Sequence, residues 1–274
     1  MNITGTPVAT LDDCSGALTN PEIIILSTMN TILGLTSILG NALILAAIYK
    51  VQAQRTVSNA FIASMSVADF TVGLFMNPLW VAKSVLNIWR SNNQLSTVIE
   101  VFTMQTIVAT TLSLCAVSMD RYIAVTRMRY SEIMTWKRVR IIIVSIWVFS
   151  ILFASLRLII TDPFQLPKLW LVATAITVIT PLTLISICYY FILKAARLQI
   201  KRISAEETFN PDEAIVQLKN HKAAFTIGII VGVFAVCWTP SLVISLLQFF
   251  TSDLCEKTRI NGYWFWGALA EFSN

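Results

Sequence analysis

The chain alternates between long apolar stretches and short polar segments. A helix needs about 20 apolar residues to cross the hydrocarbon core of a bilayer, and several stretches of roughly that length follow one another along this sequence. They lie at residues 23–49, 59–86, 95–126, 139–160, 169–196, 222–250 and from 261 onward. This pattern predicts an all-α fold, a bundle of seven transmembrane helices.

The seventh stretch is shorter than the others. It has about 14 residues before the sequence stops at Asn274, which is too few for a crossing. We therefore expect the seventh helix to be truncated at the C-terminus. The prediction divides the chain into an N-terminal segment, residues 1–22, and a transmembrane domain, residues 23–274.

Composition and charge agree with a membrane location. The 274 residues are 56% hydrophobic and 13% charged, with a mean hydropathy of +0.71, which does not suit a soluble domain. A net charge of +5 could suggest nucleic acid, but the charge follows the spans instead. With the N-terminus outside, 14 of the 20 Lys and Arg residues fall on the cytoplasmic side. The positive-inside rule therefore predicts an extracellular N-terminus and no nucleic-acid partner.

The five cysteines divide by location. Cys115, Cys188 and Cys237 fall inside predicted spans and are expected to pack as small apolar residues. Cys14 and Cys255 fall on the predicted outer side, where a disulfide and two free thiols both remain open.

Several spans carry a residue that lipid disfavours. An ionised side chain near the bilayer centre costs about 3 kcal/mol on insertion scales, so such groups are kept mainly for a task inside the bundle. The residues of this kind are Asn41, Asp69, Asp120 with Arg121, Pro181 and Pro240. Their presence indicates more than a structural role for these helices.

Six short motifs occur in order, one in each of the first six spans. They are Gly40-Asn41, Ser66-Val67-Ala68-Asp69, Asp120-Arg121-Tyr122, Trp147, Pro181 with Tyr189, and Cys237-Trp238-Thr239-Pro240. Any one alone is a weak signal. Together they resemble the rhodopsin-like (class A) G-protein-coupled receptors, and the resemblance runs from the first span to the end of the chain.

The resemblance implies a plasma-membrane receptor that performs no catalysis. Binding of an extracellular small-molecule or peptide ligand would activate a heterotrimeric G protein through outward movement of the sixth helix. Pro240 removes a backbone hydrogen bond and so creates a bend in that helix, and in the resemblance Arg121 then leaves Asp120. The implied switch residues are Asp120, Arg121, Tyr122, Pro181, Tyr189, Phe234, Trp238 and Pro240.

Asp69 needs polar partners in the middle of the membrane. Asn41 and a hydroxyl of the third span are the natural candidates. The hydroxyls available there recur at steps of three and four and so share one helix face; they belong to Thr103, Thr106, Thr110 and Ser113. The resemblance implies that Asp69, Thr110 and Asn274 hold a sodium ion that favours the inactive state. The alternative is a stripe of small residues that lets helices approach closely. No cofactor is otherwise expected.

The expected ligand pocket carries two acidic residues, Glu100 and Glu271. Amine receptors hold the ligand ammonium with an aspartate where this chain has Thr103, so a simple monoamine is disfavoured. A buried carboxylate without a partner prefers to be protonated. Either Arg157 or Lys83 neutralises one of the two glutamates, or a cationic ligand does. The rest of the pocket is apolar, with helix packing as the alternative for each residue: Met104, Ile107, Trp238, Leu242, Trp264, Ala268 and Phe272.

The sequence departs from the family at two places. Many relatives carry a glutamate at the inner end of the sixth helix, where this chain has Asn220-His221-Lys222, so only Asp120 remains to restrain Arg121 and raised basal signalling is expected. The usual disulfide at the top of the third helix is absent, as in melanocortin receptors, and residues 129–135 resemble the second inner loop of that group. Melanocortin receptors usually lack Pro181, so the subfamily stays open.

Other classes of membrane protein fit less well. An opsin needs a lysine in the seventh helix for its Schiff base, and Phe272 stands there. A transporter would need interrupted half-helices or inverted repeats, which the sequence lacks. A non-signalling scaffold of receptor type remains the main alternative.

Overall fold

The computed structural model describes residues 18–87, 94–127, 129–162 and 165–203, and six single positions at 229, 232, 233, 236, 239 and 243. These residues cover the first five predicted spans. Within them every regular element is helical. The switch residues Phe234, Trp238 and Pro240 lie outside the described residues, as does Asn274.

The helices follow the predicted spans closely. The first span is α1 (Asn20–Lys50), the third α4 (Gln94–Thr126) and the fourth α6 (Trp136–Ile159). The second is built from α2 (Val57–Thr71), η3 (Val72–Met76) and α3 (Asn77–Val85), and the fifth from α7 (Leu166–Thr174), η4 (Ala175–Ile179) and α8 (Thr180–Ile203). Two short elements, η2 (Gln52–Gln54) and α5 (Tyr130–Ile133), lie in the connections. By length and composition, all five spans can cross a membrane.

The two segmented spans share a cause. Both η3 and η4 are π-helical turns, and a proline, Pro78 or Pro181, follows each within two residues. Because proline cannot donate a hydrogen bond to the carbonyl four residues back, the turn before it widens. The sequence signals a break at these prolines but not its π-helical form.

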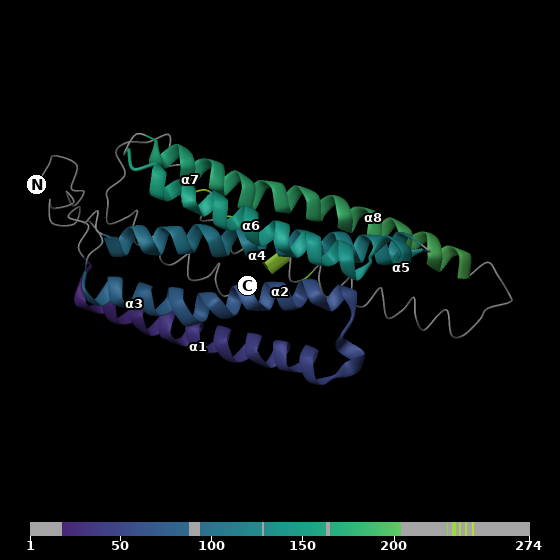
Figure 1. Ribbon diagram of the computed structural model, residues 1–274, viewed down its shortest axis with the longest axis horizontal. Coiled ribbons are helices and arrows are strands. Elements are labelled where there is room, and N and C mark those ends of the chain that lie inside the picture. The colour runs from purple at the N-terminus through teal and green to yellow at the C-terminus, as the bar shows by residue number, and fades with distance from the viewer. Residues whose placement is uncertain are drawn as a thin grey trace, which may run out of the picture.

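The helices run side by side, with α4 between two groups (Figure 1). On one side α4 contacts α2 and α3, which in turn pack on α1; on the other side it contacts α6 and α8. The third span therefore places its polar residues inside the bundle.

Two glycines allow α1 and the second span to approach closely. A side-chain carbon at Gly73 would lie 2.8 Å from the carbonyl oxygen of Gly34, whereas one at Gly40 would meet nothing within 4 Å. Small residues at a helix contact let backbones come together in lipid. This contact holds Asp69, four residues before Gly73, against α1.

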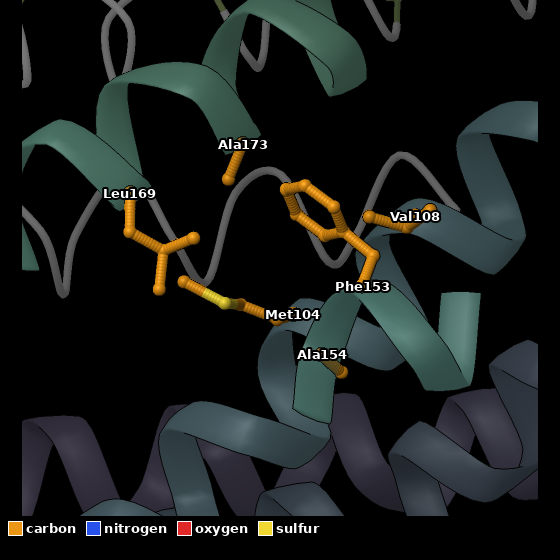
Figure 2. Packing of buried hydrophobic residues seen from close by; sticks show 6 residues of the cluster. All are labelled: Met104, Val108, Phe153, Ala154, Leu169 and Ala173. Carbon is orange, nitrogen blue, oxygen red and sulfur yellow. The ribbon is translucent and has the colours of Figure 1, made fainter. Parts of the chain in front are cut away.

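An apolar cluster joins α4, α6 and α7 (Figure 2). It consists of Met104, Val108, Phe153, Ala154, Leu169 and Ala173. Met104 is 1% exposed and packs among these side chains. It therefore contributes to helix packing, while its expected place in the ligand pocket stays a prediction.

Candidate functional site

Asp69 lies at the centre of the bundle and is 1% exposed. Thr110 donates a hydrogen bond of 2.9 Å from Oγ1 to Asp69 Oδ1. The Ser37 hydroxyl donates to the backbone carbonyl of Asp69 over 2.7 Å. Asn41 donates to the carbonyl of Ser37 over 3.0 Å and not to the carboxylate. The expected hydroxyl partner on the third span is therefore present. Asn41 is connected to Asp69 only indirectly, through Ser37.

The second carboxylate oxygen of Asp69 accepts no hydrogen bond from the described residues. Among the described residues, Asp69 Oδ2 and the buried hydroxyl of Ser113 have no hydrogen-bond partner. Thr103 and Thr106 instead donate to carbonyls of their own helix, at Ile99 and Phe102. On the hydroxyl face of α4, Thr103 and Thr106 are therefore hydrogen-bonded, whereas Ser113 has a hydroxyl without a partner among the described residues. A carboxylate with nearby hydroxyl oxygens suits a hard cation.

A second polar group surrounds Asp120, which is 1% exposed. We call this end of the bundle the inner end, after its predicted orientation, and the opposite end the outer end. Arg121 Nε lies 3.9 Å from Asp120 Oδ2, an ion pair without a hydrogen bond. Tyr130 donates its hydroxyl to Asp120 Oδ1 over 2.6 Å, and the Ser58 hydroxyl donates to Oδ2. Hydroxyls from α5 and α2 thus bind both oxygens of the carboxylate.

These two hydroxyls were missed by sequence reasoning. Burial, and then the hydrogen bond to Asp120, raises the pKa of the Tyr130 hydroxyl, so Tyr130 stays protonated and remains a donor at neutral pH. The signal available in the sequence was depth in the membrane. Ser58 lies near the start of the second span and Asp120 near the end of the third, so both are expected at the same membrane level. Depth alone did not predict which side chains face one another.

Other motif residues connect neighbouring helices. Trp147 Nε1 donates to Ser64 Oγ over 3.0 Å, which joins α6 to α2. The rings of Tyr122 and Phe191 lie 5.9 Å apart between α4 and α8. Tyr189 has a buried hydroxyl without a partner in the described part of the chain. Pro181 follows the π-helical turn of the fifth span.

At the outer end, Glu100 of α4 pairs with Arg157 of α6. Arg157 Nε lies 2.5 Å from Glu100 Oε2, and Arg157 is only 4% exposed. Lys83 lies over the ring of Trp80, with 5.3 Å between the ammonium and the ring centroid. Of the alternatives left open by the sequence, Arg157 is thus the direct partner of Glu100.

The remaining pocket residues are only partly placed. Thr103 is half-buried, with its hydroxyl bonded to the carbonyl of Ile99. Ile107 packs against a cluster of Leu114 and Ile185. Outside the described residues lie Leu242, Trp264, Ala268, Glu271 and Phe272, together with Trp238. Cys115 and Cys188 are buried and free, while Cys14, Cys237 and Cys255 also lie outside.

Comparison with known proteins agrees with this arrangement. Residues 40–273 match the family described as 7 transmembrane receptor (rhodopsin family). The chain is 28% identical over 258 residues to the histamine H2 receptor of Rattus norvegicus, covering 88% of this chain and 71% of that protein. It is 32% identical over 215 residues to melanocortin receptor 4 of Danio rerio, covering 76% of this chain and 64% of that protein. The chain therefore belongs to the rhodopsin family of seven-transmembrane receptors: it is a G-protein-coupled receptor that crosses the plasma membrane several times, and not an enzyme.

Proposed function

We propose that this receptor binds an extracellular small-molecule or peptide ligand in its outer half and activates a heterotrimeric G protein at its inner end. Its N-terminus would then lie outside the cell. The observation that carries the proposal is the pair of buried Asp120 and partly buried Arg121 at the inner end of α4, with both Asp120 oxygens bound by neighbouring segments.

This pair supports a switch between two states. Arg121 is attracted by Asp120 but makes no hydrogen bond to it at 3.9 Å, so a modest rearrangement can release it. The sixth helix would bend at Pro240, its inner half would move outward, and Arg121 would leave Asp120 to contact the G protein. Tyr189 of α8, whose hydroxyl has no partner among the described residues, would then help stabilise the released state.

The outer end constrains the ligand. The relatives named above include one receptor named for histamine and one named for melanocortin. In this chain Thr103 supplies no charge, and the carboxylate of Glu100 is already paired with Arg157. We therefore propose a ligand whose main anchor is not an ammonium group bound by α4.

The test is G-protein activation by the receptor in cells, measured as nucleotide exchange without ligand and against panels of amines, nucleosides, lipids and peptides. Arg121→Ala is expected to abolish basal and ligand-driven exchange, because the proposed contact with the G protein is lost. Arg127→Ala removes an exposed cation six residues further along, just after the end of α4; it is the matched control and should retain activity. A response that survives Arg121→Ala at normal surface expression would contradict the proposal and favour the scaffold alternative.

We also propose that Asp69 and Thr110 hold a sodium ion, with Asn274 as a further ligand. The open oxygen Asp69 Oδ2 and the hydroxyl of Ser113 support this assignment. The ion would supply a positive charge at the buried carboxylate and so stabilise the packed, inactive bundle. No other cofactor is required.

Sodium should therefore raise the thermal stability of the purified receptor. Since a ligand stabilises by RT ln(1 + [L]/Kd), NaCl at about ten times Kd adds about 1.4 kcal/mol, or a few degrees in unfolding temperature. Choline chloride at equal ionic strength should not have this effect. Asp69→Asn is expected to remove the difference between the two salts. An equal response of the wild type to both salts would exclude the site.

A further inference from the structure

A groove of about 460 Å³ opens at the inner end, between the start of the second span and the connection that joins the third and fourth spans. Its walls combine apolar and hydroxyl side chains: Thr56, Val57, Ser58, Tyr130, Ser131, Met134, Thr135 and Trp136. None of the proposed ligand or sodium residues belongs to it. The groove is therefore distinct from the proposed ligand and sodium sites, while it shares Ser58 and Tyr130 with the Asp120 group.

The groove lies at the level where the membrane surface begins. Helix α2 starts at Val57 and α6 at Trp136, and both helices continue as apolar spans. Trp136 is 47% exposed, as is typical of tryptophan at the interface between headgroups and acyl chains. A molecule in the groove would thus contact the inner leaflet on one side and the protein on the other.

Four exposed cations lie within two residues of the wall residues in the sequence. Arg129 and Lys137 are next to wall residues and exposed. Arg55 and Arg138 direct guanidinium nitrogens to the neutral backbone carbonyls of Tyr49 and Ile133, so their charges are not cancelled by these bonds. The nearby carboxylate of Glu132 forms an exposed ion pair with Arg129 at 3.5 Å. An ion pair exposed to water is weak.

We propose that this groove binds an anionic phospholipid of the inner leaflet, with its phosphate near Arg129 and Lys137 and an acyl chain along Val57, Met134 and Trp136. The cytoplasmic leaflet is negatively charged, and each nearby Lys or Arg adds to the attraction. The charge of the rim and the apolar character of the deeper wall match the two parts of such a lipid.

Lipid in the groove would act on the Asp120 group. Ser58 and Tyr130 line the groove, and the same two hydroxyls bind the carboxylate of Asp120. A bound lipid packs against both side chains and keeps them on Asp120, which favours the arrangement with Arg121 restrained. Basal signalling should then fall as anionic lipid increases; this consequence rests on the proposed function and orientation, whereas binding itself does not.

The test measures lipid retention directly. The complete receptor is reconstituted in nanodiscs of phosphatidylcholine with phosphatidylserine, and the lipids that remain attached are counted by native mass spectrometry. Arg129→Gln with Lys137→Gln is expected to lower the preference for phosphatidylserine about tenfold. The matched control, Lys50→Gln with Lys194→Gln, removes two exposed cations elsewhere at the inner end and should leave the preference unchanged.

A second pair of variants tests the groove rather than the charge. Ser131→Phe fills it without a change of charge and should lower retention of phosphatidylserine, whereas Ser131→Ala should not. Equal losses in the two charge variants, or full retention in Ser131→Phe, would overturn the proposal. Protection of the groove by purified G protein, with no selective lipid retention, would also overturn it and assign the surface to that partner.

Discussion

Replacing Asp120 with Asn is expected to raise ligand-independent G-protein activation about tenfold. Asp120 is the carboxylate that contacts Arg121 in the described part of the chain, and the inner end of the sixth span offers Asn220, His221 and Lys222 instead of an acid. Neutralising Asp120 removes an attraction that we put at roughly 1–2 kcal/mol after solvation. Since 1.4 kcal/mol is a factor of ten in an equilibrium, the released state becomes correspondingly more populated. Nucleotide exchange normalised to surface expression measures the change.

The matched control is Glu132→Gln at the same end of the bundle. Glu132 also pairs with an arginine, Arg129, but both side chains are more than half exposed, so this ion pair contributes little and basal exchange should not change. Tyr130→Phe and Ser58→Ala keep the charge of Asp120 and are expected to have smaller effects than Asp120→Asn. If Asp120→Asn leaves basal exchange at the wild-type level, Arg121 is restrained by something other than this charge.

Only part of the Asp120 group could be predicted from the sequence. The charges of Asp120 and Arg121 stand out against an apolar helix, so their importance could be predicted. Ser58 and Tyr130 carry hydroxyls that occur throughout the chain, and only the rotation of α2 and the path of α5 bring them to Asp120. Such contacts depend on how helices are turned about their axes, which hydropathy does not define.

The spans themselves were predictable because lipid imposes a strong and uniform requirement on their length. Predicted and observed bounds of the first four spans agree within three residues, for example 95–126 against Gln94–Thr126. The partner of Asp69 was also predictable, since the hydroxyl repeat on the third span includes Thr110. For Met104 the sequence left both ligand contact and helix packing open, because one helix presents neighbouring faces to the pocket and to α6, and spacing alone does not separate them.

Breaking the ion pair at the outer end should cost the receptor much of its stability. Glu100→Gln leaves the guanidinium of Arg157, which is 4% exposed, without its carboxylate. Loss of one partner of a buried pair costs about 3–5 kcal/mol, and partial exposure of Glu100 reduces this to about 2–3 kcal/mol. The unfolding temperature in detergent is expected to fall by about 5–10 °C. Thermal denaturation followed by size exclusion measures the shift.

The pair itself, however, need not be the best solution for stability. If the cost comes from an unpaired buried cation, then removing both charges should restore most of it, because a well-packed apolar pair often equals a buried ion pair. Glu100→Gln with Arg157→Met is therefore expected to recover more than half of the lost unfolding temperature. A double variant no more stable than Glu100→Gln alone would show that the charges hold α4 and α6 together directly. The double variant could also recover its stability without responding to ligand. That result would mean that the ion pair serves ligand recognition. Arg157 would then belong to the ligand pocket, a role that hydropathy does not reveal.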